Sequence, residues 1–598
     1  MKYRLGVALL VSLVCGCEPR PRTFGSGGSG TPAPTLGEKR VLEFDLRSGA
    51  PEALEGGLFQ LPATRSYTGL VRALERGLEE DTTASVFVRL GEQDLALAQA
   101  QEVAGLLARY AKKGIPVVCH ADGLSNATAA LVAQGCTRRY LSPAGGLDTV
   151  GLAAQVVYMR GILDRLKIEA DFLHVGRFKS GPEPLTHEGP SPEAREALEV
   201  TLASLRQSWL EQVNPKLRGP LEQGPFSPNE ARSHELVDTL GFELDALAEA
   251  KKLGKVDVAS TAFGASASSN DGPDVAEILR MIAGASESVS DRPHVAVVPA
   301  QGAISTQSGG GVFSSGGITS KAMVKTLRRL AGDDAVKAVV LRIDSPGGSP
   351  LASDLIWHEV MELKKKKPVV ASVGGMAASG GYYIACAAQR IFAERASIVG
   401  SIGVFGGKIV FGPALGEIGV NSVTFPASPA PGAAERAAYL SPLIRWDDPT
   451  RKRMLSVMEG IYELFIARVA EGRKVTADKV RPHAEGRIWS GTQGLERGLV
   501  DEIGGLSQAI ASARKLAKLD ADVPVTVEGG AEGLLELLML GEDAGEAEVI
   551  AALRRLDARR TLTLEAIPAE LRPFAATLGP LLAGETVLTA LPFALTVR

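Results

Sequence analysis

One stretch of the chain places a serine hydroxyl between a strand and a helix. Residues 368–389 read PVVASVGGMAASGGYYIACAAQ, in which a short apolar strand breaks into small residues around Ser379 and continues as an apolar, helix-length run. This order can present one hydroxyl at a helix N-terminus, where free backbone N–H groups face a developing oxyanion. Glycines let a substrate approach the backbone closely. A close-packed turn with a serine N-cap would give the same pattern, so this stretch alone leaves its chemistry open.

A second stretch offers further donors for an oxyanion. Residues 344–349 read DSPGGS and follow an apolar strand predicted over 338–343. A Pro-Gly-Gly turn at a strand end exposes backbone N–H groups. Gly347 or Gly348 could therefore act together with Gly380, the residue that follows the serine.

A serine hydroxyl is a poor nucleophile unless a base takes its proton. Of the seven histidines, His174 lies nearest to a motif, in ADFLHVGRF, five residues before Lys179 in VGRFKSGPEP. A lysine can also act as the base if burial lowers its pKa, by as much as roughly 3–5 units for a fully buried group. The residue types alone leave both candidates open.

The elements that must position these residues form two similar α/β units. Apolar strands alternate with amphipathic helices, which indicates parallel strand pairing with right-handed crossovers. In the first unit we predict strands over 85–90, 115–119 and 138–142 and helices over 99–113 and 126–134. Longer packing helices are predicted over 191–212 and 448–469, one in each unit.

The second unit repeats the first at a nearly constant spacing. The sequence PVV at 116–118 recurs 252 positions later at 368–370, and LVD at 236–238 recurs 263 positions later at 499–501. The second unit is therefore about 11 residues longer, and the Ala/Pro-rich loop 426–440 is the expected place of the insertion.

The two units carry different functional groups. At the 252-residue shift Ser379 corresponds to Ala127, and the first unit has Gly-Glu-Gln at 91–93 in place of a Pro-Gly-Gly turn. Conversely, the second unit has no counterpart of Lys179, because 420–431 reads VNSVTFPASPAP. One unit offers the serine and the other the lysine.

The motifs VGRFKS, DSPGGS, GGMAASGGYY, GSIG and GRIWSG stand in the order of one known family. From about residue 41 to 519 the chain resembles signal peptide peptidase A (protease IV) in its long, duplicated form. The resemblance implies two tandem copies of a crotonase/Clp-protease-like α/β unit plus a small C-terminal extension. It implies an active site assembled between the two halves, with the following roles: Ser379 as nucleophile, Lys179 as general base, Ser401 of GSIG orienting the lysine, and the N–H groups of Gly380 and of Gly347 or Gly348 binding the oxyanion. Asp344 stands where the family often has asparagine.

The N-terminus is typical of a bacterial lipoprotein signal. A basic start (Lys2, Arg4) precedes an apolar run over 5–14 that is too short to span a bilayer, and VCGC follows. We predict lipidation at Cys17, with a plain cleaved signal as the alternative. The predicted domains are a signal peptide (1–17), a flexible tether (18–39), an N-terminal repeat supplying the lysine (40–261), a linker (262–293), a C-terminal repeat supplying the serine (294–519) and an extension of unknown role (520–598).

The remaining cysteines, Cys119, Cys136 and Cys386, are odd in number and lie in apolar surroundings. We predict buried free thiols rather than a disulfide framework, and no metal-ligand spacing or cofactor motif is present. The net charge of −4, without a basic stripe, argues against nucleic-acid binding.

The expected function is that of a serine endopeptidase tethered to a membrane by its lipid, with a Ser-Lys dyad. By the resemblance, its substrates are cleaved signal peptides and other apolar segments in the bacterial cell envelope, on the periplasmic side. The membrane, inner or outer, is left open, and a homotetramer is expected. Two alternatives are an acyl-CoA hydratase of the related crotonase fold and an inactive lipoprotein scaffold on the same fold.

Overall fold

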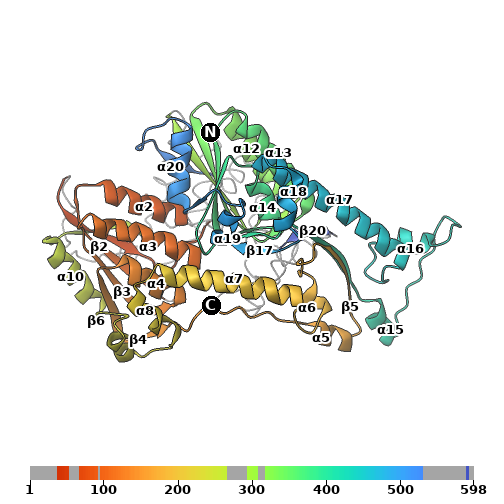
Figure 1. Ribbon diagram of the computed structural model, residues 1–598, viewed down its shortest axis with the longest axis horizontal. Coiled ribbons are helices and arrows are strands. Elements are labelled where there is room, and N and C mark those ends of the chain that lie inside the picture. The colour runs from red at the N-terminus through yellow and green to blue at the C-terminus, as the bar shows by residue number, and fades with distance from the viewer. Residues whose placement is uncertain are drawn as a thin grey trace, which may run out of the picture. The chain divides into compact units, whose positions relative to one another are not determined.

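The computed structural model describes residues 37–52, 66–91, 95–264, 292–306, 317–528 and 587–590. The predicted signal peptide with Cys17, and most of the tether, the linker and the C-terminal extension, lie outside these residues, so the boundaries predicted there stay predictions. From Lys39 onward the chain forms one compact unit. Its described part contains three β-sheets (Figure 1).

The first sheet is parallel throughout, in the order β6-β4-β3-β2-β1-β7. Its strands are β1 (Arg40–Asp45), β2 (Thr83–Leu90), β3 (Val117–Ser125), β4 (Arg138–Asp148), β6 (Thr239–Leu240) and β7 (Ala259–Phe263). The helices on one face are α2 (Tyr67–Glu79), α3 (Leu97–Lys112) and α4 (Asn126–Gly135), and α10 (Glu243–Gly254) covers the other. Because both faces are covered, the central strands are apolar on both sides.

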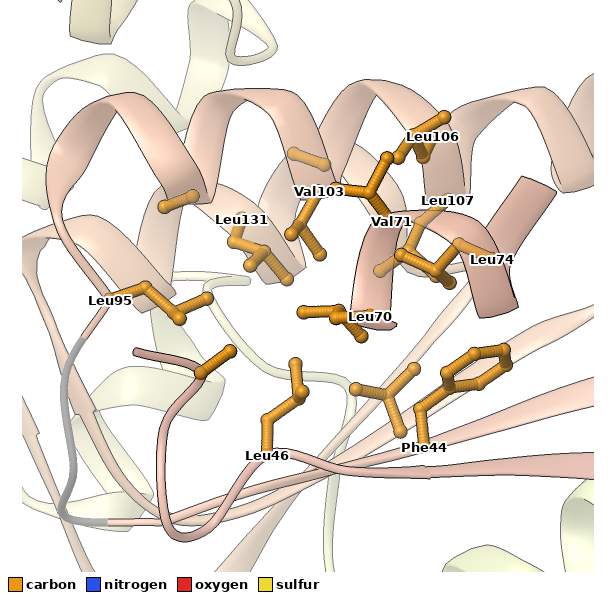
Figure 2. Close-up of a cluster of buried hydrophobic side chains, with 14 of the residues drawn as sticks. Phe44, Leu46, Leu70, Val71, Leu74, Leu95, Val103, Leu106, Leu107 and Leu131 are labelled. Atoms are coloured by element: carbon orange, nitrogen blue, oxygen red, sulfur yellow. The ribbon is translucent and has the colours of Figure 1, made fainter. Parts of the chain in front are cut away.

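Side chains alternate between the two faces of this sheet. Leu42 and Phe44 of β1 point into the cluster with α2 and α3, whereas Val41 packs with Phe87 against α10. Figure 2 shows the first cluster, in which Phe44 and Leu46 meet side chains from the helices. The two-residue period of a strand is what separates these sets.

The second sheet has the order β17-β15-β13-β11-β8-β19, with β14 beside β13 and β18 beside β14. Its strands are β8 (His294–Gln301), β11 (Val336–Ser345), β13 (Val369–Ala378), β14 (Arg390–Ala393), β15 (Ile398–Gly400), β17 (Ile488–Ser490), β18 (Glu502–Ile503) and β19 (Val525–Val527). All pairs are parallel except β15 with β17. The larger helices are α12 (Ser320–Gly332), α13 (Pro350–Lys364), α14 (Gly380–Ala385), α17 (Asp448–Arg473) and α20 (Leu506–Leu516).

One large hydrophobic cluster contains residues of both halves. Val340 and Val370 of the second sheet and Ile510 of α20 belong to the same buried cluster as Leu74 of α2. Buried polar contacts cross the same boundary: Arg342 donates to Glu52 at 2.6 Å. The halves therefore pack as one body and hold their site residues in fixed relation.

A third, smaller sheet connects the halves near the predicted site. Its order is β10-β9-β12-β20-β16-β5. The strands are β5 (Glu169–Val175), β9 (Ile304–Ser305), β10 (Ile318–Thr319), β12 (Gly347–Gly348), β16 (Val404–Val410) and β20 (Val587–Ala590). β5 from the first half pairs antiparallel with β16 from the second along seven residues.

The remaining helices connect these layers. They are α5 (Arg160–Arg165), α6 (Glu183–Thr186), α7 (Pro192–Glu211), α8 (Pro215–Arg218), η1 (Pro220–Glu222), α9 (Pro228–Ser233), α15 (Gly412–Glu417), α16 (Ala433–Ala437), α18 (Ala477–Val480), η3 (Arg481–His483) and α19 (Gly491–Glu496). The helix predicted over 191–212 is α7, and its N-cap is Ser191, whose hydroxyl accepts from the Ala194 N–H at 3.1 Å. α17 continues to Arg473, four residues beyond its prediction, and ends at the left-handed Lys474.

The prediction of two tandem α/β units is confirmed. The order β3-β2-β1-β7 of the first sheet matches β13-β11-β8-β19 of the second. The strand predicted over 138–142 is longer and reaches Asp148. Residues 525–527, in the predicted extension, form β19 and pair with β8 as β7 pairs with β1.

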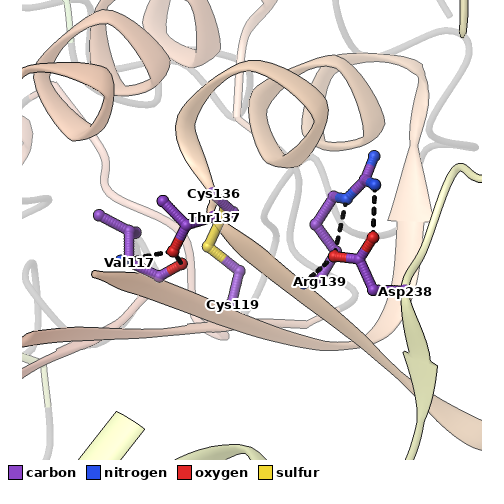
Figure 3. The surroundings of a disulfide bond; sticks show 6 residues. All are labelled: Val117, Cys119, Cys136, Thr137, Arg139 and Asp238. Atoms are coloured by element: carbon purple, nitrogen blue, oxygen red, sulfur yellow. Dashed lines mark hydrogen bonds and ion pairs between the residues drawn. A yellow bond between two sulfur atoms is a disulfide. The ribbon is translucent and has the colours of Figure 1, made fainter. Parts of the chain in front are cut away.

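The prediction that all three internal cysteines are free thiols is wrong. Cys119 in β3 and Cys136 at the end of α4 form a disulfide with a Cα–Cα distance of 6.0 Å (Figure 3). Three cysteines can form one disulfide and leave one free thiol. Helix α4 follows β3 and brings its last residues back beside that strand. Cys386 is free and buried, and burial raises its pKa to about 12, which keeps the thiol protonated and inert.

Candidate active site

Ser379 stands at the junction of β13 and α14 in a strained conformation. Its φ is +54°, a region that non-glycine residues rarely occupy and that often marks functional sites. Its N–H donates to the Gly400 carbonyl at 2.7 Å, and its carbonyl accepts from the Tyr383 N–H at 2.8 Å. These two bonds hold the residue between sheet and helix, and its side chain is fully buried.

Lys179 reaches this serine from the other half of the chain. It follows β5 in a short loop, and its side chain is fully buried. The amine Nζ lies 2.9 Å from Ser379 Oγ, 3.0 Å from Ser401 Oγ and 3.0 Å from the Ser401 carbonyl oxygen. The structure therefore brings together the three side chains predicted for the dyad and its orienting group.

The environment of Lys179 favours the neutral amine. Burial holds the pKa of Lys179 well below its usual range, because the charged form loses its hydration. The groups around Nζ are two hydroxyls and a carbonyl, which bond without charge. Within the described residues, Nζ forms no salt bridge that would raise the pKa again.

A short segment that the sequence analysis gave no role, Glu485–Arg487, connects the lysine loop to Ser401. The Phe178 N–H, beside Lys179, donates to the Glu485 carbonyl at 2.7 Å. The Gly486 N–H donates to the Ile402 carbonyl at 2.7 Å, and the Ser401 N–H donates to the Arg487 carbonyl at 2.8 Å. We call residues 485–487 the clamp, because their backbone bonds both the residue before the lysine and the serine that contacts it.

Glycines allow this close approach. A Cβ on Gly486, whose φ is +77°, would lie 2.6 Å from the Cβ of Lys179, and a Cβ on Gly403 would lie 2.9 Å from the Cα of Gly486. Gly486 opens the motif GRIWSG, which the sequence analysis noted without assigning a function. The sequence signal that could have indicated this role was the glycine of GRIWSG, a family motif to which no catalytic group is assigned.

The predicted oxyanion residues also lie together. A Cβ on Gly380 would lie 2.7 Å from Ser353 Oγ and 3.1 Å from both the Cα of Gly347 and the backbone nitrogen of Gly348, so Gly380 packs directly against the glycine turn. The N–H of Gly347, however, donates to Ser345 Oγ at 3.1 Å. Gly380 and the Gly347–Gly348 turn therefore lie side by side next to the candidate nucleophile.

Asp344 lies behind the site rather than in it. Its Oδ1 accepts from the Met376 N–H at 3.0 Å, three residues before the nucleophile. Burial, with the nearby Glu52 carboxylate, raises the pKa of Asp344 to about 7. A neutral side chain, such as the asparagine common in the resembling family, makes the same backbone contact without a charge.

His174, the alternative base, is directed elsewhere. It lies on β5 with an exposed side chain, and its Nδ1 lies 3.1 Å from the Gly176 carbonyl oxygen. The position beside Ser379 Oγ is taken by Lys179.

At the corresponding junction of the first half, between β3 and α4, the serine is an ordinary helix N-cap. Here Ser125 begins α4 with an ordinary φ of −89°, and its hydroxyl accepts from the Thr128 N–H at 3.3 Å. By its place in the fold Ser125, rather than Ala127, matches Ser379, but it lacks the left-handed backbone and the lysine contact. The functional asymmetry predicted from the repeat therefore has a structural counterpart.

Among the residues that the structure describes, no group of three or more His, Cys, Asp or Glu side chains could hold a metal ion. No helix in the described ranges has the length and apolar character needed to cross a membrane.

Comparisons with known proteins agree with the fold and the duplication. The model of peptidase family S49 matches residues 109–257 and 361–520, and that of the Clp protease family matches 312–400. Chloroplastic serine protease SPPA of Arabidopsis thaliana is 29% identical over 412 residues, which cover 66% of this chain and 57% of that one. Protease 4 of Salmonella typhi is 33% identical, covering 69% and 66%. Protease 4 of Haemophilus influenzae is 28% identical, covering 87% and 84%.

The chain thus spans somewhat less than two thirds of the length of the first two relatives. Among solved structures, a mutant form of ClpP1 from Listeria monocytogenes matches with a TM-score of 0.23 and 15% identity, over 36% of this chain and 94% of that one. A TM-score of 0.23 is too low to indicate a shared arrangement of the whole chain.

Proposed function

Because the chain belongs to peptidase family S49, we propose that it is a serine endopeptidase in which Ser379 and Lys179 form a catalytic dyad. The observation that carries the proposal is the 2.9 Å distance between Lys179 Nζ and Ser379 Oγ inside a fully buried site. A nucleophile within hydrogen-bond reach of a base, with the base oriented by a third group, is the arrangement that activates a serine.

The chemistry follows from the neutral amine. A neutral lysine has two N–H donors and one lone pair. The two N–H groups donate to the carbonyl and the hydroxyl of Ser401, which directs the lone pair at the Ser379 hydroxyl. The hydroxyl proton then passes to Nζ as Oγ attacks the peptide carbonyl carbon. We propose that the N–H of Gly380 and that of Gly347 or Gly348 bind the resulting oxyanion.

The lysine returns the proton in the next step. When the C–N bond breaks, the leaving amine takes the proton from Nζ, and an ester to Ser379 remains. Water attacks this ester and gives a proton to Nζ. The C–O bond to Ser379 breaks, and the serine recovers its proton from Nζ while the acid product leaves.

The proposed substrates are cleaved signal peptides and other apolar segments, as expected from the sequence motifs. We propose that Cys17 carries a lipid that tethers the enzyme in a bacterial cell envelope, facing the periplasm, and that the enzyme acts as a homotetramer. The disulfide between Cys119 and Cys136 supports this compartment, because disulfides persist in oxidising environments and are rare in the cytosol.

A labelling experiment tests the dyad. The full chain is treated with a fluorophosphonate probe, which bonds covalently to an activated serine, and is compared with Ser379→Ala, Lys179→Ala and Ser233→Ala. Ser233 is an exposed serine at the end of α9 and serves as the matched control. We expect label on the unmodified chain and on Ser233→Ala, and none on the other two.

Cleavage of an apolar signal-like peptide should follow the labelling. Label that persists in Ser379→Ala, or cleavage that persists in it, would show that another residue is the nucleophile. A chain that neither labels nor cleaves any peptide would favour the inactive scaffold.

A further inference from the structure

Strand β20, residues 587–590, lies between two strands that carry predicted site residues. On one side it pairs antiparallel with β12, with Gly347 opposite Ala590 and Gly348 opposite Thr589. On the other side it pairs antiparallel with β16, with Phe405 opposite Leu588 and Gly406 opposite Val587. Without β20 the edges of β12 and β16 would face each other across the width of one strand.

The surroundings of this strand belong to the candidate active site. β12 is the glycine turn beside Gly380, and β16 begins three residues after Ser401. β5, the next strand beyond β16, leads directly into the loop of Lys179. A polypeptide in the position of β20 therefore runs alongside the elements that supply the oxyanion turn, the orienting serine and the base.

The side chain of Leu588 is enclosed by apolar side chains, and we call this enclosure the pocket. It is fully buried and packs in one cluster with Phe172, Leu185 and Phe405. The wall of the pocket is fixed, because Gly181 approaches Phe405 so closely that a Cβ would lie 2.7 Å from the ring. Gly181 is two residues after Lys179, so the pocket and the base are built by one loop.

We propose that residues 587–590 are an intramolecular ligand of the peptide-binding cleft and compete with substrate for it. An extended peptide that adds a strand between β12 and β16 gains main-chain hydrogen bonds on both edges and selectivity from the pocket. Residues 587–590 satisfy both requirements and belong to the same chain, so their binding to this cleft is intramolecular. The inference rests on the proposed function, since it assumes that the cleft binds peptide substrates.

The alternative is that β20 is a permanent structural strand. The two possibilities differ in what loss of Leu588 does. A charge in the pocket would release a competing ligand and improve substrate binding, whereas it would only destabilise the protein if the strand were structural.

The first test compares Leu588→Asp in the full chain with Leu244→Asp, a control at a leucine of α10 that is 76% exposed. Cleavage of an apolar fluorogenic peptide is measured at several substrate concentrations. We expect KM to fall roughly 10-fold in Leu588→Asp with kcat nearly unchanged, since an intramolecular competitor of the substrate is removed. Leu244→Asp should match the unmodified chain. An unchanged or higher KM in Leu588→Asp would overturn the proposal.

The second test does not depend on catalysis. A fluorescent peptide of residues 585–592, ETVLTALP, is titrated into the Ser379→Ala/Leu588→Asp variant and, in parallel, into Ser379→Ala. We expect saturable binding to the first and at least 10-fold weaker binding to the second, whose cleft is occupied. The same peptide with aspartate in place of Leu588 should not bind. Equal binding to both variants, or binding by neither, would overturn the proposal for residues 587–590. The expected difference in binding, together with no peptidase activity in the unmodified chain and in Leu588→Asp, would count against the proposed function alone.

Discussion

Gly486 lies against the backbone of Lys179 with no room for a side chain between them. A Cβ added to Gly486 would lie 2.6 Å from both the Cβ and the backbone nitrogen of Lys179, closer than non-bonded atoms approach. The position of the lysine thus depends on a glycine 307 residues further along the chain, and the clamp sets where the amine sits relative to Ser379.

Gly486→Ala should reduce kcat by about 100-fold, because a displacement of about 1 Å in a catalytic group has an effect of that size. The φ of +77° adds backbone strain. Steady-state kinetics checks the loss, and circular dichroism checks that the fold persists. The matched control is Gly460→Ala, in the middle of α17, where a Cβ meets no atom within 4 Å. If Gly486→Ala keeps normal kcat, the clamp does not position the base.

Lys179→Arg should be inactive although it keeps a long basic side chain, since a guanidinium stays protonated and cannot take the proton of Ser379. Lys179→Ala and Ser379→Ala should each abolish turnover, and the double variant should be no worse than either, because the pair acts as a unit. Single-turnover assays of all four proteins measure this. Additive losses, or turnover by Lys179→Arg, would contradict the dyad.

Stability should also depend on pH through Lys179. Its folded-state pKa is lowered by burial, whereas in the unfolded chain it is about 10.4. Between these two values the unfolded state binds one more proton, so the free energy of unfolding rises with pH across this window, and below the lowered pKa the full penalty is present. Activity should rise with pH through the same lowered pKa, where the amine becomes neutral.

Lys179→Met should therefore be more stable than the unmodified chain at pH 6, with a difference that shrinks as pH approaches about 10. Urea unfolding at pH 6, 8 and 10 measures it. Lys337→Met, at an exposed lysine of β11, is the control and should show no such convergence. A Met variant that is less stable at pH 6 would show that the amine is not carrying a burial penalty.

Reduction of the disulfide should destabilise the protein by about 3 kcal/mol, the value for closing a loop of this length. The two cysteines are 17 residues apart. The loss should appear as a lower midpoint of urea unfolding with dithiothreitol. Cys119→Ala/Cys136→Ala should show it without reductant, and Cys386→Ala should respond to the reductant as the unmodified chain does. An unchanged midpoint would mean that the bond does not form in solution.

The α/β repeat and the turn at Ser379 could be predicted because both have strong local signals. A strand of branched residues, a run of small residues and an apolar helix follow one another at 368–389, and the duplication shows twice which elements are structural. The lysine was harder to predict, since nothing local distinguishes Lys179 from a solvated lysine. Its burial comes from β16 and the clamp, which are distant in sequence.

The clamp and the disulfide escaped prediction for a related reason. The clamp acts through backbone N–H and carbonyl groups, which every residue has, so its side chains give little sign of it. The odd number of internal cysteines argued against a disulfide between Cys119 and Cys136. The two residues nevertheless meet because Cys119 lies in β3 and Cys136 lies at the end of α4, the helix that follows β3. Contacts made by backbone or by topology leave the weakest trace in a sequence.

The clamp also sets a time before which the proposed enzyme cannot work. The N–H of Arg177, two residues before Lys179, donates to the Glu485 carboxylate, and the two residues are 308 positions apart. At about 5–20 residues per second, synthesis needs about 15–60 s to pass from one to the other. During that interval Lys179 has been synthesised but the clamp that positions it has not. A newly made chain is thus unable to digest itself or its neighbours until synthesis has passed Glu485, and this delay follows from the order of the two segments in the sequence.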